Sequence, residues 1–397
     1  MKLASNSNLP EPDRALVLKD AEQLTFLEVP AAGTKRNLSP LPIATGSPSQ
    51  RERVRLEQKY RDAFEHRLDW RRLVTYVPNK GLPVYNWFKY KEGFSRELVV
   101  RLVRQFGLQK GDIVFDPFVG CGTTLLAAQE LGLHGIGVDI LPTSVFVARA
   151  KLTKWPDLDE ILSASQKLLE APFREPKSTF PRDVRIINLA FTKETQAELL
   201  FFKEETEKFQ PPFRHFLLLG LLSILESVSR TSKDGQFLRL VDKKIPPVRE
   251  ALRSILGRMA ADLSELRTFG QEPKTKAVVR QGDAREMCLP VRYEGRVAAI
   301  ITSPPYLNRY DYSRTYALEL CLLTAKSHRD MVNIRHSLLR SHVESREHAN
   351  KAIELPALDL GSGVSFRSFC ENRPKIEDGH RCFCSSRCFF SSLASVL

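Results

Sequence analysis

The stretch DPFVGCGTT, residues 116–124, decides the fold of this chain. It follows a short apolar run, DIVF, and leads into TLLAAQELG, a run typical of a helix. Gly120 and Gly122 let the backbone turn sharply and approach a ligand without obstruction by a Cβ atom. The helix that follows directs free N–H groups at the same space. The stretch therefore predicts a ligand-binding turn between a strand and a helix.

A second strand, GIGVDI at 135–140, follows that helix and completes a β-α-β unit. Such a unit predicts an α/β fold with a parallel, doubly wound, Rossmann-like sheet. Asp139 lies nineteen residues after Gly120, where an acid can accept hydrogen bonds from both hydroxyls of a ribose. The third glycine of the GxGxxG pattern is absent, which disfavours a nucleotide-dependent dehydrogenase.

The rest of the chain predicts one discontinuous domain. Helical patterns dominate the middle, and strand patterns resume at KAVVRQGDA and RVAAIITSPPY. The helical part is thus expected to be an insert between two parts of one sheet. The expected segments are a disordered N-terminal segment at 1–50, a first part of the sheet domain at 51–155, the helical insert at 156–272, a second part of the sheet domain at 273–360, and an atypical tail at 361–397.

The sequence SPPY, residues 303–306, ends the apolar strand VAAIIT. Consecutive prolines stiffen the backbone and remove two N–H donors, but their carbonyls remain as acceptors at the carboxyl end of the strand. The Ser303 hydroxyl and the Pro304 carbonyl could hold the hydrogens of an exocyclic base amine and direct its lone pair at a methyl donor. Tyr306 offers an aromatic face for stacking. A base in a duplex must be flipped out to reach such a place.

Together these motifs resemble those of the amino-DNA methyltransferases. DPFVGCGTT resembles the family's motif for S-adenosylmethionine (AdoMet), usually DPF-x-G-x-GTT, and SPPY resembles its catalytic motif. The resemblance implies an AdoMet-dependent DNA methyltransferase in which residues 303–306, including Pro305, are catalytic. Serine in first position is most typical of cytosine-N4 enzymes, whereas aspartate or asparagine is more typical of adenine-N6 enzymes. Methylation of adenine N6, methylation of RNA, and an inactive fragment that binds nucleic acid remain alternatives.

The resemblance also assigns the cofactor contacts. Phe94 and Ser95 match the segment that covers the methionine end, although Ser95 could equally cap a helix. Asp139 matches the ribose acid and Ile140 its apolar neighbour on the adenine face. Asp283, with Ala284, matches the acid that binds the adenine amino group; a generic aspartate at a strand end is the alternative. The glycine turn supplies the remaining contacts: Asp116, Pro117, Phe118, Gly120, Gly122 and Thr123.

Charge points to an anionic partner. Lysine and arginine number 60 against 47 acidic residues, a net charge of +13, and nucleic acid is the usual partner of such a chain. The insert, a candidate target-recognition element, carries SRTSKDGQFLRL at 229–240 around a glycine turn. Candidate DNA contacts there and after SPPY are Arg230, Lys233, Arg239, Asn308 and Arg309, each with a solvated loop or plain packing as the alternative.

Several expectations are negative. No apolar run reaches the length of a membrane span, so a cytoplasmic protein without membrane contact is expected. His380 and the cysteines around it match no standard zinc spacing, and no metal is expected. Family sheets continue with further strands after the catalytic motif, but the sequence after Tyr306 is mostly helical in pattern. Part of the sheet is therefore expected to be missing, with an altered tail. A cognate restriction or defence partner follows only from the resemblance, and the oligomeric state stays open.

Overall fold

The computed structural model describes residues 54–55, 67–234, 237–268, 275–285, 289, 293, 295–305 and 310–338. The chain divides into two units, Met1–His66 and Arg67–Leu397. Of the first, only Val54 and Arg55 are described, in helical conformation. The predictions for residues 1–50 and 361–397 and for Tyr306, Asn308 and Arg309 lie outside the described residues.

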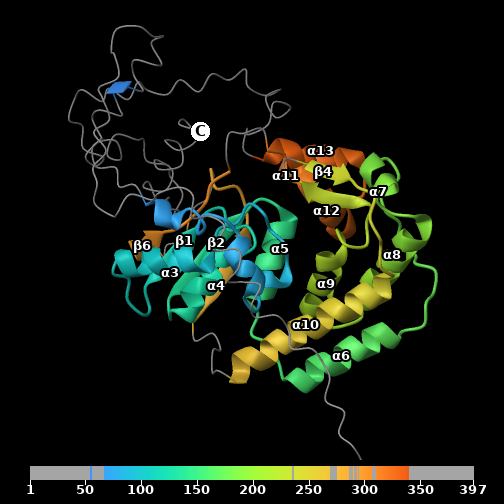
Figure 1. The fold of residues 1–397 in the computed structure, drawn as a ribbon, viewed down its shortest axis with the longest axis horizontal. Coiled ribbons are helices and arrows are strands. Elements are labelled where there is room, and N and C mark those ends of the chain that lie inside the picture. Colours follow the sequence, from blue (N-terminus) through green and yellow to red (C-terminus); the bar gives the residue numbers. More distant parts are fainter. Residues whose placement is uncertain are drawn as a thin grey trace, which may run out of the picture. The chain divides into compact units, whose positions relative to one another are not determined.

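The second unit contains a four-stranded parallel sheet (Figure 1). Its strands are β1 (Ile113–Asp116), β2 (His134–Asp139), β5 (Ala277–Gln281) and β6 (Val297–Ile300), in the order β5-β2-β1-β6. From β1 the chain adds β2 and then β5 on one side, and it returns to place β6 on the other side. The direction of winding therefore switches between β1 and β6, as in doubly wound folds. The predicted α/β fold with a parallel sheet is confirmed.

Helices α3 (Arg96–Gln105), α4 (Thr123–Glu130) and α5 (Pro142–Lys151) pack against this sheet. Two glycines of β2 make the close approach of α4 possible. A Cβ atom added to Gly137 would lie 2.7 Å from Val119 Cγ2, and one added to Gly135 would lie 2.9 Å from Leu125 Cγ. The sequence GIGV thus brings the glycine turn and its helix onto the strand.

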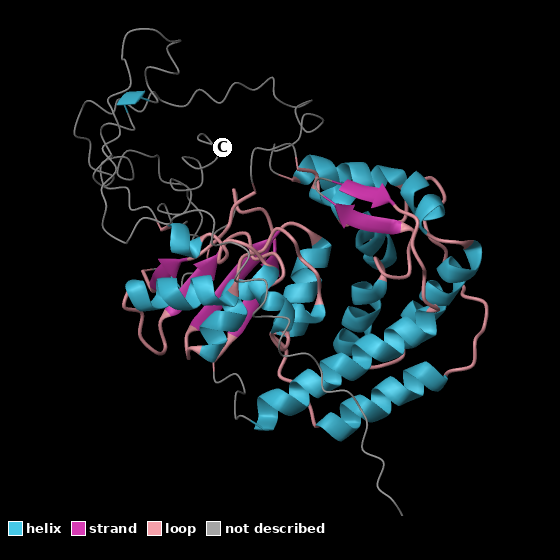
Figure 2. Cartoon of the chain, in the orientation of Figure 1, coloured by secondary structure: helices cyan, strands magenta, loops and turns pink. Residues whose placement is uncertain are grey.

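The insert between β2 and β5 is mainly helical, as predicted (Figure 2). Its core is the apolar helix α9, whose residues Phe216 and Leu217 are fully buried. The basic stretch at 229–240 contains two strands that pair as an antiparallel hairpin. The elements are α6 (Leu158–Glu170), α7 (Arg185–Ala190), α8 (Lys193–Glu207), α9 (Phe213–Ile224), β3 (Thr231–Asp234), β4 (Phe237–Leu240) and α10 (Val248–Thr268).

After β6 the described residues form helices, not strands. They are α11 (Tyr312–Thr315), α12 (Ala317–Leu323) and α13 (His328–Ser337). The carboxylate of Asp311 caps α11 and also pairs with Arg335 Nε of α13 at 2.8 Å. Because Asp311 is almost fully buried, this pair holds α13 in a defined place.

The segment before α3 contains three 3-10 helices, η2 (Leu68–Trp70), η3 (Val77–Gly81) and η4 (Tyr85–Trp87). Trp87 of η4 contacts Trp155, just before the insert, and Phe216 of the insert, with ring centroids 5.8 and 5.7 Å away. Edge-to-face packing of this kind adds to the stabilisation from burial. One core therefore joins this segment to the insert. No helix among the described residues is long and apolar enough to cross a membrane.

Candidate active site

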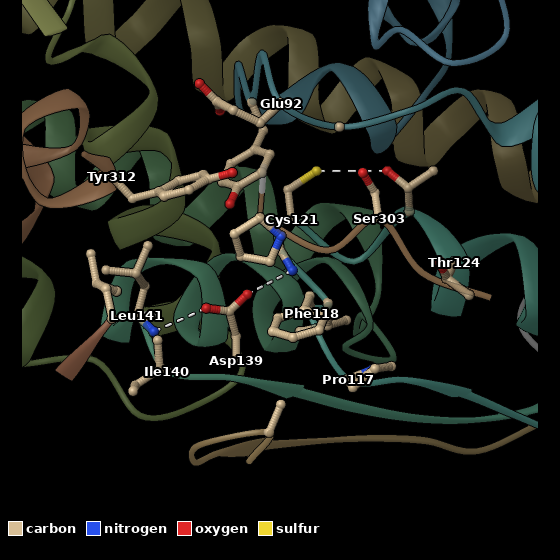
Figure 3. Close-up of a pocket in the computed structure, with 18 of the residues that line it drawn as sticks. Glu92, Pro117, Phe118, Cys121, Thr124, Asp139, Ile140, Leu141, Ser303 and Tyr312 are labelled. Atoms are coloured by element: carbon tan, nitrogen blue, oxygen red, sulfur yellow. Dashed lines mark hydrogen bonds between the residues drawn. The ribbon is translucent and has the colours of Figure 1, made fainter. Parts of the chain in front are cut away.

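A cavity opens at the carboxyl ends of the parallel strands (Figure 3). Its empty space amounts to about 830 Å³ when the open solvent at its mouth is counted. The switch between β1 and β6 places it where open α/β sheets bind ligands. Sequence-predicted residues that line it are Phe94, Pro117, Phe118, Gly120, Thr123, Asp139, Ile140, Asp283, Ala284, Ser303 and Pro305.

The glycine turn forms one wall. Gly120 has φ +50°, and a Cβ atom there would lie 3.0 Å from the Tyr90 ring, so a side chain at this position would be both strained and crowded. Gly122 has φ +87° and faces Ala148, not the cavity; it shapes the turn and lets α5 approach. No side chain caps α4, so the N–H groups of its first turn remain available to an anionic group at Thr123.

Asp139 organises this wall from the end of β2. Its Oδ2 accepts a hydrogen bond from the Gly120 N–H at 2.9 Å, and its Oδ1 accepts one from the Leu141 N–H at 2.9 Å (Figure 3). Burial raises the pKa of Asp139 to about 6, against the opposing effect of these two hydrogen bonds. A carboxylate has about four acceptor positions, so Asp139 can accept two further donors from a ligand.

Asp116 links the two strand ends instead of lining the cavity. It is 1% exposed and accepts hydrogen bonds from the Phe118 N–H at 3.1 Å and the Thr302 hydroxyl at 2.7 Å. Burial raises its pKa to about 6. The Thr124 hydroxyl adds a second link, to the Ile301 carbonyl at 3.3 Å. The glycine turn and the SPPY motif are thus fixed relative to each other.

The start of SPPY shares the cavity with the glycine turn. Ser303 and Pro305 line it together with Gly120, and Figure 3 shows Ser303 on the same side as Cys121. Pro304, between Ser303 and Pro305 in the chain, does not line the cavity. The two motifs, far apart in sequence, therefore meet at one site.

The other predicted contacts differ in their surroundings. Phe118 and Ile140 give apolar walls. Asp283 lines the cavity, but Arg285 already pairs with its carboxylate, and the Arg285 N–H donates to Oδ1 at 2.9 Å. Ser95 is fully buried, and its hydroxyl accepts from the Leu98 N–H. Ser95 therefore caps α3, the alternative that the sequence left open.

The lining residues that the sequence did not predict include Tyr90, Glu92 and Tyr312. Glu92 lies near the top of the cavity in Figure 3, close to Tyr312. Its carboxylate accepts hydrogen bonds from the hydroxyls of Tyr310 and Tyr316. Tyr90 and Glu92 lie just before Phe94 in FKYKEGF. Their closeness to Phe94 in the sequence is the one signal from which a place in the cavity could have been predicted for them. Tyr312 arrives from a separate helix.

The structure contradicts the expected phosphate contact of Lys233. Its side chain is 3% exposed, and its ammonium pairs at 2.5 Å with Glu319, which is 1% exposed. The ammonium also lies 4.3 Å from the centroid of the Tyr316 ring. Lys233 thus joins the hairpin to α12 inside the core and cannot reach a phosphate. Arg230 and Arg239, by contrast, are exposed.

Comparison with known proteins matches this chain to a DNA methylase family and to Type II methyltransferases. The model of a family described as DNA methylase matches residues 8–148, a range that includes the glycine turn and Asp139. The chain is 36% identical over 307 residues to the Type II methyltransferase M.BsoBI of Geobacillus stearothermophilus, which covers 69% of this chain. It is 32% identical over 314 residues to the Type II methyltransferase M.AvaI of Nostoc sp. (strain PCC 7120), which covers 74% of this chain.

These matches span 59% of the M.BsoBI sequence and 64% of the M.AvaI sequence. A shorter match, 35% identical over 101 residues and 25% of this chain, relates it to the Type II methyltransferase M.MjaII of Methanocaldococcus jannaschii, of which it covers 19%. No solved structure matches the chain significantly.

Proposed function

Because the chain belongs to the amino-DNA methyltransferase family, we propose that it transfers the methyl group of AdoMet to the exocyclic amino group of a DNA base, cytosine N4 in first place. The observation that carries this proposal is the single cavity lined by both Gly120 and Ser303. A methyl donor and an acceptor amine must meet within about 3.5 Å to react, and only a shared cavity permits that.

The residues of the cavity fit AdoMet. Phe118 and Ile140 offer apolar faces for an adenine, and Asp139 has two free acceptor positions for ribose hydroxyls. The uncapped start of α4 suits the methionine carboxylate, and the Glu92 carboxylate suits an ammonium group. When bound, AdoMet would supply an electrophilic methyl group on a positively charged sulfur.

The SPPY loop would orient the acceptor amine. The Ser303 hydroxyl and the Pro304 carbonyl accept the amine hydrogens, which draws the nitrogen lone pair out of conjugation with the base ring. The nitrogen held in this way would be free to accept the methyl group that bound AdoMet supplies, and the proton that the nitrogen loses would pass to solvent. The links from Asp116 to Thr302 and from Thr124 to Ile301 would keep the acceptors aligned with the donor. Alignment of this kind lowers a barrier by several kcal/mol.

Ser303 supports the preference for cytosine, since serine in this position is most typical of N4 enzymes. In the proposed complex Tyr306 stacks on the flipped base, and Tyr312 gives a second aromatic side chain at the cavity. Arg230 and Arg239 of the hairpin, with Asn308 and Arg309 after SPPY, would contact DNA. Residues 156–272 would then form the target-recognition element, and a cognate restriction or defence protein would be the partner.

The direct test is mass spectrometry of nucleosides from duplex DNA incubated with the protein and labelled AdoMet. We expect label in N4-methylcytosine. Label only in N6-methyladenine would overturn the choice of base. Label confined to RNA in a parallel incubation, or no transfer despite AdoMet binding, would overturn the proposed activity.

Ser303→Ala tests the role of the hydroxyl. We expect turnover to fall about 100-fold, because one of two acceptors that align the amine is lost. The dissociation constant for AdoMet should change less than about threefold, since the cofactor contacts lie on the glycine turn. Ser227→Ala is a matched control, because that hydroxyl bonds only within its own turn at Ile224 O. Equal losses of turnover and AdoMet affinity in Ser303→Ala would contradict the assignment.

A further inference from the structure

A second cavity lies away from the candidate active site, where α4 and α5 of the sheet domain meet α10 of the insert. It encloses about 720 Å³, including solvent at its mouth. Its lining is mainly apolar, with Val84, Leu126, Leu263 and Leu266 among its walls. It shares no lining residue with the cavity at the strand ends, so it is a separate site.

Lys151, at the end of α5, lines this cavity and is 3% exposed. Its ammonium donates one hydrogen bond, to the Tyr85 carbonyl at 3.0 Å, and no carboxylate of the described residues pairs with it. Burial lowers the pKa of Lys151. A buried lysine usually pairs with a buried acid, as Lys233 does with Glu319. A buried ammonium without one is costly, and it has two donors left for an anion.

Further polar atoms of the cavity lack partners. Gln129 is 6% exposed, and its amide NH₂ donates to the Thr275 carbonyl at 3.0 Å. That bond fixes the amide, but Gln129 Oε1 is buried without a hydrogen bond, and so is Trp155 Nε1. Buried polar atoms of this kind need a water or ligand. Lys151 and Trp155 thus offer donors and Gln129 offers an acceptor, in a cavity that the charged residues Glu130, Lys154 and Arg267 also line.

The backbone beside the cavity is strained. Val84 has φ +66° and ψ −42°, a conformation that a β-branched residue rarely adopts. Asp262 of α10 holds it there, since Oδ2 accepts from the Val84 N–H at 3.3 Å and from the Trp87 indole at 2.8 Å. Strain that persists in this way concentrates at ligand sites.

We propose that this cavity binds a small aromatic monocarboxylate that also carries a hydrogen-bond donor. The carboxylate would pair with the Lys151 ammonium and accept from Trp155 Nε1. The donor would bond to Gln129 Oε1, and the ring would lie among the leucines. A carboxylate suits the site, because the lining carries three cationic side chains, Lys151, Lys154 and Arg267, against one acid, Glu130.

Titration with 4-hydroxybenzoate, followed by ligand-observed NMR, tests the proposal on the full chain. We expect a dissociation constant in the low millimolar range or tighter. The neutral 4-hydroxybenzamide should bind at least about tenfold more weakly. No binding of 4-hydroxybenzoate at about 10 mM, or equal binding of both compounds, would overturn the proposal. The assay contains neither AdoMet nor DNA, so its failure leaves the proposed methyl transfer untouched.

Two variants locate the site. Lys151→Met should abolish the preference for the carboxylate over the amide, and Leu266→Trp should fill the cavity and weaken both ligands about tenfold or more. Leu266 is only partly buried, so this variant keeps the proposal testable if Lys151→Met fails to fold. Lys193→Met, an exposed lysine at the start of α8, is the control and should bind both compounds like the unaltered chain. Unchanged affinity for 4-hydroxybenzoate in a folded Leu266→Trp variant would overturn the site.

Discussion

Asp139 combines two functions at the scale of a single residue. It holds the glycine turn through the Gly120 N–H and keeps two acceptor positions for a ligand. Burial raises its pKa to about 6. The ionised form, which accepts hydrogen bonds from two hydroxyls, is therefore lost as the pH falls through that value.

AdoMet affinity should consequently depend on pH. Above about pH 7 Asp139 is ionised and affinity is at its plateau; below about pH 6 the dissociation constant should rise up to about tenfold per pH unit. Calorimetric titration between about pH 5 and pH 7.5 measures this. In Asp139→Asn, affinity should be lower and independent of pH in this range. A pH dependence that persists in the variant would assign the titration to another group, such as Asp116, whose pKa is also about 6.

Lys233 and Arg239 lie in the same hairpin but should respond oppositely to substitution. Lys233→Met should lower the free energy of unfolding by about 3–5 kcal/mol, because it leaves the Glu319 carboxylate buried and unpaired. Arg239→Ala should change stability by less than about 0.5 kcal/mol, and should reduce the slope of log affinity against log salt by about 0.9 for DNA.

Chemical denaturation and DNA titrations at several salt concentrations separate the two roles. The double variant Lys233→Met/Glu319→Leu should recover most of the stability, since no charge is then left without a partner. If Lys233→Met reduced the salt dependence of DNA affinity and left the stability unchanged, Lys233 would contact phosphate after all, against the structure.

At the scale of the elements, the packing of α4 on β2 fixes the glycine turn. Val119 N–H donates to the Val138 carbonyl at 2.8 Å, and Gly137 leaves room for the Val119 side chain. The absence of a side chain at Gly137 therefore determines where the glycine turn lies.

Gly137→Ala should destabilise the protein by about 1–3 kcal/mol, because its Cβ would lie 2.7 Å from Val119 Cγ2. It should also weaken AdoMet binding by displacing the turn. Gly257→Ala is the matched control, since Gly257 lies within α10 and a Cβ there meets nothing within 4 Å. This control should stabilise the protein by up to about 1 kcal/mol. Denaturant unfolding would contradict the prediction if both variants shifted stability in the same direction.

At the scale of the second unit, the sheet domain and the insert are bound through a shared aromatic core. Trp87, from the segment that leads to the cavity residues 90–94, packs against Trp155 and Phe216. Loss of this contact should therefore affect both the insert and the site.

Phe216→Ala should cost about 3–5 kcal/mol, because Phe216 is 1% exposed at the centre of this core. Thermal unfolding of the unaltered protein should show coincident transitions by tryptophan fluorescence and far-ultraviolet circular dichroism. Leu189→Ala, at an exposed position, should change stability by less than about 0.5 kcal/mol. Two separate transitions, with the insert unfolding first, would show that the aromatic core does not couple the parts.

The sequence alone determined the parallel sheet, the turn at DPFVGCGTT and the helical character of the insert. Each of these depends on local signals: glycines that allow positive φ, apolar runs of strand or helix length, and the order in which they alternate. It also predicted that Ser303 and Asp139 lie near each other, and both line one cavity, since the carboxyl ends of parallel strands meet at one edge of the sheet.

Only the tertiary structure decided which polar side chains are buried and paired. Lys233 and Arg239 belong to one short basic stretch, yet the partner of Lys233 lies 86 residues further along the chain. The Glu92 carboxylate likewise accepts hydrogen bonds from Tyr310 and Tyr316, which lie more than 200 residues further along the chain. Lys151 differs from Lys233 in that none of the described carboxylates pairs with its ammonium. Charge compensation in a buried site is a long-range property, since it depends on which distant segments pack together, and a local pattern does not contain it.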